Sequence, residues 1–537
     1  MSSHHDAVPD PGADELDAEV LVVGAGPVGC WLAAELCAVG VGVMVVEARQ
    51  VRSAWSRGFV VHPRTLEIFD TRGAAAALLE VGNRVPTWHF AMAASRLDFT
   101  VLPTTFPFVL LQPQARTEEL LEQHLIDSGG AVLRGQRFLG LRQKADRVAV
   151  RLRSDGIERS VAVRFVVGCD GAHSAVRRAA GIGFSGNPDT MVSPTALVEL
   201  ADPPPPEHYM QTRDNGVFFA IPLPDGRFIV STVDHAVMHA LDAPWTAETL
   251  RASLLRITGS DYGMGDVERV STIGNSARQA DRYRAHRVLL AGDSAHVHFP
   301  MGGQGMNLGI QDAHNLAWRL TAAVQAQRDD PAAGPCDIVL DGYEAERRPV
   351  GERVLEDVRA QMALVTATGA DGAALRSRME SLLAGHQQVN LEYARRLSGI
   401  DVRYPTTQDP HGGARGADVR LGTRVPDLLL KPVGANPTRL HILLREIGPG
   451  RFVRLSVTRD GAGASEASAS SGKPGASAMS SRAVSSDRPP TEPLPDTDVA
   501  SIAASAVLGP HWALREGWGT AESVLIRPDG HVADLSA

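Results

Sequence analysis

A short glycine-rich stretch near the start of the chain constrains the fold more than any other feature. Gly24, Gly26 and Gly29 follow the compact apolar run Ala18–Val23 in the spacing GxGxxG, and Val41–Glu47 is a second apolar run. The residues between the glycines and the second run have helical spacing of apolar side chains. Such runs predict buried parallel strands, and two of them joined by a helix form a right-handed βαβ unit. The sequence therefore predicts an α/β fold with a Rossmann-like sheet.

The three glycines have different roles in such a unit. Gly24 permits the tight turn from strand to helix, Gly26 lets the backbone approach a pyrophosphate, and Gly29 allows the helix to pack closely on the strand. Pro27 begins the helix, whose free N–H groups and positive dipole end suit phosphates. Glu47 ends the second strand and can accept both hydroxyls of an adenosine ribose. The pattern predicts a dinucleotide site, and the charge of Glu47 disfavours the 2′-phosphate of NADP(H) there.

Two features of a later stretch indicate which dinucleotide binds. Asp293 follows the apolar run Val288–Ala291, where a carboxylate can accept hydrogen bonds from the hydroxyls of a ribityl chain, which NAD lacks. Gly302, Gly303 and Gly305 precede a predicted helix. The N–H groups and dipole of a helix start suit an anionic ring edge, such as the N1–C2=O side of a reduced flavin. Together with the first motif, these residues predict FAD.

A third motif lies between the other two. Asp170 and Gly171 follow the apolar run Phe165–Val167, and Arg177 lies about two helical turns further on. An acid and an arginine near the cofactor can organise a pyrophosphate or a visiting nicotinamide nucleotide. A turn with an acid that caps a helix gives the same pattern, so the motif alone leaves both interpretations open.

Composition excludes several other classes of protein. The chain has 537 residues with a net charge of −9 and no strongly basic tract, which argues against a nucleic-acid or anionic-membrane partner. No apolar run reaches the roughly 18–20 residues of a membrane span. Four cysteines without a CxxC pair predict neither a zinc site nor dithiol chemistry. We expect a cytoplasmic protein without a metal site.

Changes in texture along the chain predict its domains. A polar start predicts a disordered extension, and a Ser-, Ala-, Gly- and Pro-rich stretch near the end predicts a disordered insert. The apolar runs Val217–Leu223 and Phe228–Val233 flank a turn signal and predict a hairpin in a separate antiparallel sheet. The predicted divisions are the extension 1–17, a discontinuous FAD-binding domain 18–185 and 277–400, a substrate-binding sheet domain 186–276, and a C-terminal domain 411–537 with the insert 461–498.

The three motifs closely resemble those of the flavin-dependent aromatic hydroxylases, the group A monooxygenases of the para-hydroxybenzoate hydroxylase fold. The GxGxxG motif, the DG motif at Asp170–Arg177 and the GD motif at Gly292–Asp293 occur in the family's order. Ser56–Gly58, His62–Glu67 and Gln114 match as well. The likeness covers about the first 400 residues. It implies a Rossmann-like FAD-binding domain with a mixed-sheet substrate domain.

The tail resembles the thioredoxin-like C-terminal domain of the longer members, which include phenol hydroxylases and polyketide-tailoring oxygenases. Gly422–Asp427 and Arg527–Ala533 carry this likeness. The tail has no CxxC pair, so thiol redox activity is not implied. Such a domain offers a surface for a homodimer or merely caps the fold, and the sequence leaves both open.

The resemblance also implies roles for individual residues. Arg57 and Gln114 would contact FAD, although Gln112 is a nearby competitor for the role of Gln114. Asp293 would hold the ribityl chain, and residues 306 and 307 would lie against the isoalloxazine ring. The full set of expected FAD-binding residues is Gly24, Gly26, Pro27, Gly29, Glu47, Arg57, Gln114, Asp170, Gly171, Asp293, Pro300, Gly305, Met306 and Asn307.

The activity implied by the resemblance is an NAD(P)H-consuming monooxygenation. NADPH or NADH reduces FAD, O2 is trapped as a flavin C4a-hydroperoxide, and one oxygen passes to an electron-rich aromatic carbon. The middle sheet is rich in apolar residues and shows no clustered arginines, which favours a phenolic or polycyclic, polyketide-like substrate over a small aromatic acid. Baeyer–Villiger oxygenation of a polyketide ketone, a flavin oxidoreductase without oxygenation, and a non-enzymatic flavoprotein scaffold remain alternatives.

The base that would activate a phenol cannot be assigned from the sequence. His89, Tyr209, His235 and His298 are candidates by their chemistry alone. His296 follows the GD motif, and we expect it to be structural or close to the flavin rather than a base. The catalytic residues therefore remain unknown at this stage.

Overall fold

The computed structural model describes residues 16–52, 58–223, 225–267, 270–330, 334, 336–405, 420–457, 499–509, 518 and 522–536. The predicted insert, Arg57 and the predicted extension before residue 16 lie outside these ranges. Asp17, which the sequence places in the extension, is instead held against the main sheet. Its N–H donates to the Ala162 carbonyl at 2.9 Å, and its carboxylate accepts from the Ala162 N–H at 2.8 Å.

The predicted βαβ unit lies at the centre of the main sheet. β1 pairs in parallel with β2 on one side and with β11 on the other. The sheet has the order β19–β20–β11–β1–β2–β8, and β10 and β9 extend it beside β11. Its central strands are buried on both faces, which explains their unbroken apolar runs. The strands are β1 (Ala18–Val23), β2 (Val43–Glu47), β8 (Val132–Arg134), β9 (Arg137–Gln143), β10 (Val148–Ser154), β11 (Ile157–Gly168), β19 (Arg284–Ala285) and β20 (Val288–Leu290).

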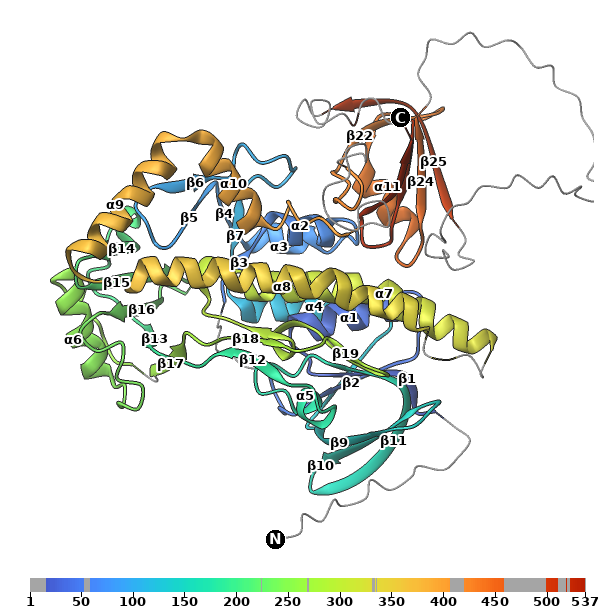
Figure 1. Cartoon of the computed structure of the whole chain (residues 1–537), viewed down its shortest axis with the longest axis horizontal. Coiled ribbons are helices and arrows are strands. Elements are labelled where there is room, and N and C mark those ends of the chain that lie inside the picture. The colour runs from blue at the N-terminus through green and yellow to red at the C-terminus, as the bar shows by residue number, and fades with distance from the viewer. Residues whose placement is uncertain are drawn as a thin grey trace, which may run out of the picture.

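Long helices cover the main sheet. Figure 1 shows α7 and α8 running across the middle of the molecule, and α1 packs against α7 and α4. Almost all of α1 is buried, and its Trp31 packs against Phe69 with ring centroids 4.8 Å apart. No helix among the described residues is long and apolar enough to cross a membrane. The helices are α1 (Pro27–Cys37), α4 (Gln114–Asp127), α5 (Ala175–Ala179), α7 (Gly305–Asp329) and α8 (Asp337–Thr366).

Short elements fill the space around these layers. Two small sheets have the orders β3–β7–β4 and β12–β18–β21. The helices α2 and α3 follow β3 along the chain. The short elements are β3 (Val60–Val61), α2 (Pro63–Asp70), α3 (Ala75–Val81), β4 (Asn83–Val85), β7 (Val109–Leu111), β12 (Phe184–Asn187), β18 (Ala277–Ala280), β21 (His296–Val297) and the single-turn helices Pro206–His208, Gly292–Ser294 and Met301–Gly303.

The predicted hairpin is confirmed and lies in an antiparallel sheet of its own. β15 and β16 pair through the whole of both strands, in the order β14–β15–β16–β13–β17. One face of this sheet packs against α6, and the alternation of side chains along each strand separates that face from the other. The elements are β13 (Val192–Val198), β14 (Met210–Arg213), β15 (Gly216–Pro222), β16 (Phe228–Asp234), α6 (Ala247–Thr258) and β17 (Val270–Gly274).

The other face of the antiparallel sheet joins a second apolar core. This core also contains side chains from a β5–β6 hairpin, from the residues before α7 and from the helices that follow α7. The sequence predicts helices over 345–367 and 373–397. The first begins earlier, and the second is broken at His386, where the backbone is extended. The elements are β5 (Thr87–His89), β6 (Arg96–Asp98), α9 (Gly369–Gly385) and α10 (Gln387–Ser398).

The C-terminal region forms a separate sheet with the order β23–β22–β25–β24–β26–β27. Figure 1 places it far from the antiparallel sheet, across the long helices. The sequence predicts a short strand at Leu440–Leu444 and a helix at Val499–Leu508, and both predictions are wrong. Leu440–Leu444 is helical, because its apolar residues continue at helical spacing to Ile447. Val499–Leu508 is a strand, because β24 and β22 pair with it on both sides and override its alanine-rich helical preference. The thioredoxin-like assignment stays a prediction. The elements are β22 (Leu429–Pro432), β23 (Thr438–Arg439), α11 (Leu440–Ile447), β24 (Val453–Val457), β25 (Ala500–Gly509), β26 (Ser523–Ile526) and β27 (Val532–Ser536).

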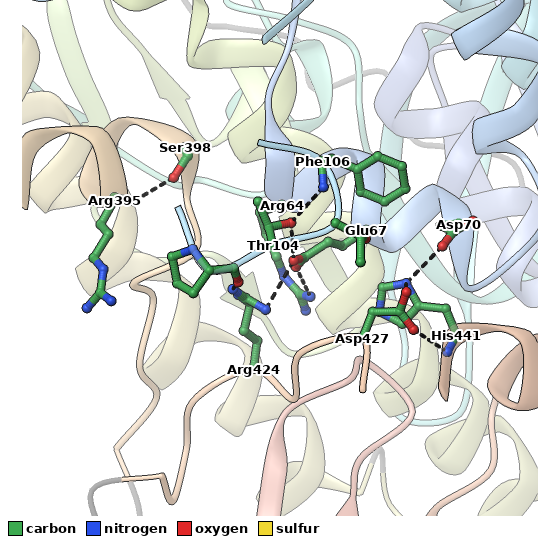
Figure 2. A network of polar contacts seen from close by, with 12 residues as sticks. Arg64, Glu67, Asp70, Thr104, Phe106, Arg395, Ser398, Arg424, Asp427 and His441 are labelled. Carbon is green, nitrogen blue, oxygen red and sulfur yellow. Dashed lines mark hydrogen bonds and ion pairs between the residues drawn. The ribbon is translucent and has the colours of Figure 1, made fainter. Parts of the chain in front are cut away.

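A buried network of charges joins this region to α2, as Figure 2 shows. The Glu67 carboxylate accepts from the Thr104 hydroxyl at 2.8 Å and from Arg64 at 3.2 Å, and it lies 3.0 Å from the Arg424 guanidinium. Glu67 itself is completely buried. The C-terminal region is therefore fixed to α2 by paired charges.

A second cluster lies one turn further along α2. His441 lies between Asp70 and Asp427 (Figure 2), a set of side chains that could hold a metal ion. The Arg439 guanidinium, however, pairs with both carboxylates, at 2.7 Å from Asp70. Because an arginine already supplies the positive charge, we interpret the cluster as an interface ion pair.

Candidate functional site

A cavity with a volume of about 720 Å³ lies where the carboxyl ends of the parallel strands meet. The turns after β1, β2, β11 and β20 form its walls, together with the first turns of α1, α4 and α7. This edge of a doubly wound sheet is the usual ligand site. Nine of the predicted residues line the cavity: Gly24, Gly26, Pro27, Glu47, Gln114, Asp170, Gly171, Asp293 and Met306.

The glycines of the first motif have the environments that the sequence predicts. Gly24 has φ +107°, and a Cβ there would lie 2.4 Å from the Cys169 carbonyl oxygen. A Cβ on Gly29 would lie 2.0 Å from the Gly24 carbonyl oxygen, so this position must be glycine although it does not line the cavity. A Cβ on Gly26 would meet no atom within 4 Å and would occupy space beside the cavity.

The start of α1 presents unpaired donors to the cavity. Gly26 is the N-cap residue and no side chain caps the helix, so its first N–H groups and the positive end of its dipole are free for an anion. The next strand ends in a carboxylate, Glu47, which accepts from the Ala25 N–H at 3.1 Å and the Arg49 N–H at 2.9 Å. Burial acts to raise the pKa of Glu47, but these hydrogen bonds outweigh it and hold the pKa below its usual value.

The GD loop is held from behind by a buried ion pair. Asp312 is completely buried, accepts from the Gly292 N–H at 3.2 Å and pairs with Arg347 at 2.8 Å. His296 lies 2.6 Å from the same carboxylate, so its role is structural. This arrangement leaves Asp293 exposed to the cavity.

The DG motif caps a helix and also borders the cavity. One oxygen of Asp170 accepts from the Ala175 and Val176 N–H groups at 2.6 and 3.1 Å and so caps α5, while the residue also lines the cavity. Arg177 does not reach the cavity. Its guanidinium donates to the carbonyls of Ser294 and Ala172 at 2.8 and 2.9 Å, and it therefore ties the DG loop to the GD loop.

The two candidate glutamines near the start of α4 have different surroundings. Gln114 lines the cavity and donates to Glu118 at 2.8 Å, whereas Gln112 is buried and donates to Thr117 at 2.8 Å. Burial raises the pKa of Glu118, which also lines the cavity. Other lining residues lie outside the predicted set: Arg49 and Gln136 follow β2 and β8, Arg137 and Phe138 begin β9, Glu118 and Arg178 lie on α4 and α5, and His173 lies within the DG motif.

The remaining predicted residues brace the loop before α7. Asn307 does not line the cavity; its side chain donates to the Val60 and Gly303 carbonyls at 2.9 and 2.8 Å and accepts from the His62 N–H at 2.8 Å. Gly305 lies beside Asp293, and a Cβ there would be 4.0 Å from its carboxylate. Pro300 is exposed and lies outside the cavity wall.

The four candidate bases also lie outside the cavity wall. Burial lowers the pKa of His89 to about 3, and Tyr209 packs edge-on against Phe228. Both ring nitrogens of His235 face backbone carbonyls, at 3.1 and 2.9 Å. His298 comes nearest, because its imidazole adjoins Gly305. No base is assigned.

Comparison with known proteins identifies the class of enzyme. A family model described as an FAD binding domain matches residues 17–358. The chain belongs to this family, its cofactor is FAD, and it is a flavin-dependent monooxygenase. The glycine cradle, the uncapped α1 terminus and the carboxylates of Glu47 and Asp293 fit an extended flavin dinucleotide.

Several relatives share most of the chain. The uncharacterized aromatic compound monooxygenase YhjG of Bacillus subtilis (strain 168) is 40% identical over 82% of this chain and 86% of its own length. Anhydrotetracycline monooxygenase of Streptomyces rimosus is 38% identical over 77% of this chain and 80% of its own. Among solved structures, OxyS anhydrotetracycline hydroxylase from Streptomyces rimosus superposes with a TM-score of 0.79 at 33% identity, covering 97% of this chain and 96% of that one. CabE, an aromatic hydroxylase from angucycline biosynthesis, gives 0.78 and 34% with the same coverage.

Proposed function

We propose that this monooxygenase consumes NADPH or NADH and hydroxylates a phenolic or polycyclic, polyketide-like aromatic compound. The observation that carries the proposal is the position of the dinucleotide cavity. Its inner end, at Asp293 and Met306, adjoins the loop before α7, and Phe299 and Met301 of that loop share an apolar core with Val217 of the antiparallel sheet. The relatives named above, which act on anhydrotetracycline or belong to angucycline biosynthesis, support a substrate of this kind.

The lining residues suggest how FAD is held. Glu47 would accept the ribose hydroxyls, and the α1 terminus at Gly24 and Gly26 would hold the pyrophosphate. Asp293 would accept from the ribityl chain, and the start of α7 would face the ring. Bound FAD supplies hydride acceptance and the activation of O2. The protein supplies binding and orientation of the cofactor.

The face of the antiparallel sheet that points away from α6 indicates a neutral substrate. Ala196, Phe218 and Val230 pack against α6, so alternate residues face the other way. On this other face, hydroxyl side chains hydrogen-bond to one another, as in the 2.9 Å contact between the Ser193 and Ser231 hydroxyls. None of the described side chains on this face is charged: Ser193, Thr195, Leu197, Met210, Thr212, Val217, Phe219, Ile221, Ile229, Ser231, Val233, Ser271 and Ile273.

Anaerobic reduction followed by oxygenation tests this function. The holoenzyme is mixed with NADPH or NADH in the presence of one compound at a time, taken from simple phenols, small aromatic acids and polycyclic phenols. The rate of flavin bleaching is measured with each compound. We expect a polycyclic phenol to accelerate bleaching and, after admission of ¹⁸O₂, to gain one labelled oxygen. If the labelled product is a lactone that opens on hydrolysis, the reaction is Baeyer–Villiger insertion and not hydroxylation. Unlabelled products throughout, or turnover with small acids alone, would overturn the proposal.

A further inference from the structure

One backbone carbonyl in the loop before α7 accepts two side-chain hydrogen bonds. The Trp88 indole N–H donates to the Gly302 carbonyl at 3.1 Å, and the His62 ring donates to the same oxygen at 2.8 Å. Both side chains are buried, at 6% and 1% exposure. Two donors on one carbonyl fix the orientation of that peptide group more firmly than a single bond would.

The His62 ring does not change its protonation state near neutral pH, so its hydrogen bond to Gly302 is constant there. A carbonyl can only accept, so Nε2 of His62 carries the proton. Its Nδ1 has no hydrogen-bond partner among the described residues. Burial lowers the pKa of His62 to about 4, so the ring is neutral at physiological pH.

The turn that carries this carbonyl is tightly packed. Gly302 and Gly303 have φ +72° and +75°, a left-handed conformation that favours glycine. A Cβ on Gly302 would lie 2.6 Å from Leu397, and one on Gly303 would lie 2.5 Å from Val60. Because glycine pairs are conformationally permissive, the shape of this turn depends on its neighbours and on the two donors.

The turn leads directly into the cavity wall. Gly305 begins α7 beside Asp293, and Met306 lines the cavity. No side chain caps α7, so its first N–H groups are free for a ligand. A change in the orientation of Gly302 would therefore displace the donors that, in the proposed function, face the flavin ring.

Trp88 is also connected to the antiparallel sheet. Two residues after its β5 strand, Ala91 and Met92 have φ +50° and +57°, which is strained for residues with a Cβ. The Met92 carbonyl accepts from the Thr212 hydroxyl of β14 at 2.7 Å, and the Ala91 N–H donates to Gln361 of α8 at 3.0 Å. The segment 88–92 therefore makes hydrogen bonds both to the loop before α7 and to β14 of the antiparallel sheet.

We propose that Trp88 is a positioning residue for oxygenation. Its indole N–H, together with His62, sets the Gly302 carbonyl, and the strained turn at Ala91 and Met92 ties that bond to the substrate-facing sheet. The consequence for the reaction rests on the proposed function, but the effect on the loop does not.

Trp88→Phe tests the inference because it keeps an aromatic ring and removes the N–H, and the ring volume that it also removes is matched in a control variant. Trp318→Phe is a matched control, since the Trp318 N–H has no partner in the described part of the chain. Two measurements are made on the FAD-loaded enzymes. The first is amide hydrogen exchange in the peptide covering 300–306; the second is peroxide released per NADPH oxidised with the best substrate.

We expect Trp88→Phe to retain FAD while exchange in that peptide accelerates about fivefold to tenfold, the value of one hydrogen bond between neutral groups. Peroxide release should rise severalfold and kcat for product should fall with little change in KM. Trp318→Phe should change neither measurement. Thr212→Val, which removes only the hydroxyl bonded to Met92, should give a smaller change in the same direction.

Wild-type exchange and coupling in Trp88→Phe would overturn the positioning role, as would equal effects in the Trp318→Phe control. If Trp88→Phe fails to fold, an unchanged 300–306 peptide in Thr212→Val would overturn the link to the sheet. Exchange is read without any substrate. If wild type hydroxylates nothing while Trp88→Phe still accelerates exchange, the proposed function fails and the effect on the loop stands.

Discussion

Two polar regions inside this protein are built in opposite ways. In the interface between the C-terminal region and the long helices, charged groups pair with one another: Glu346 accepts from Arg527 at 2.6 and 2.7 Å and from Asn315 at 2.7 Å. In the cavity at the sheet edge, Asp293 and the start of α1 face open space. Buried charges that are mutually satisfied hold the fold together, whereas polar groups that line a space are available to a ligand.

Carboxylate chemistry shows the same contrast. Arg527 bridges two carboxylates, because its guanidinium also donates to Asp529 at 3.1 and 2.5 Å. Burial acts to raise the pKa of Glu346, but Arg527 and Arg319 outweigh it and keep the group ionised. In the cavity wall, Glu118 accepts from Gln114 at 2.8 Å, and burial raises its pKa. The interface needs no ligand to be complete, and the cavity does.

The largest effect should come from breaking the interface. Arg527→Met keeps the apolar length of the side chain but leaves Glu346 and Asp529 without their bridging cation, and removal of one partner from a buried pair costs about 3–5 kcal/mol. We expect the urea midpoint to fall accordingly, while FAD affinity stays near that of wild type.

Arg328→Met is the matched control, because Arg328 also binds a carboxylate, Glu19, but is 38% exposed. Exposed pairs contribute at most about 1 kcal/mol. Equal losses in the two variants would mean that the interface is no more than a surface contact.

A second prediction concerns buried histidines, which occur in both regions. Burial lowers the pKa of His62 beside the loop before α7 and of His531 in the interface, each to about 4. Well above pH 6.5 each ring is neutral in both the folded and the unfolded protein. As the pH falls below 6.5, the unfolded chain gains a proton that the folded chain refuses. Stability therefore drops toward pH 4, by roughly 3 kcal/mol for each ring over the whole window.

Urea unfolding at pH 7.5 and pH 5.0 measures this slope. The carboxylates with lowered pKa values lose their contribution in the same direction but at lower pH, whereas a carboxyl with a raised pKa, such as Glu118, acts in the opposite direction, so the comparison with a histidine variant assigns the slope. His62→Gln should flatten the slope while retaining a donor for Gly302, and His208→Gln, at an exposed site, should leave it unchanged. A stability that is level from pH 7.5 to 5.0 would contradict the prediction.

The sequence predicts the two regions unequally, for a physical reason. The cavity depends on short segments with fixed local geometry, such as the positive φ of Gly24 and the carboxylate that ends β2, so its residues leave a pattern in the chain. Arg49, Arg137 and Arg178 line the same cavity from the loop after β2, the start of β9 and the end of α5, where the local backbone requires no particular side chain, and no pattern marks them. The interface depends on residues far apart in sequence, such as Glu67 with Arg424, and such pairs carry no local signal.

The C-terminal region shows the same limit. β25 is rich in alanine and was predicted as a helix, but neighbouring strands decide its structure. The resemblance places Asn307 against the flavin, which stays a prediction, and in the structure its side chain donates to the Val60 and Gly303 carbonyls. Sequence patterns locate a site more reliably than they distinguish the residues that touch a ligand from those that support them.

The smallest effect should separate cavity from fold at a single glycine. A Cβ on Gly26 would meet no protein atom within 4 Å and would project beside the cavity, where we expect the pyrophosphate. Gly26→Ala should therefore unfold at the wild-type urea midpoint but bind FAD about ten- to a hundredfold more weakly, since the close approach of backbone to phosphate is lost. Gly385→Ala, at an equally open position at the end of α9, should change neither quantity. Titration of FAD into the flavin-free wild type and the two variants, followed by flavin fluorescence, gives the affinity of each protein for FAD. If Gly26→Ala binds FAD as wild type does, the pyrophosphate does not lie against this turn, and the contrast between a cavity built for a ligand and an interface built for itself loses its clearest example.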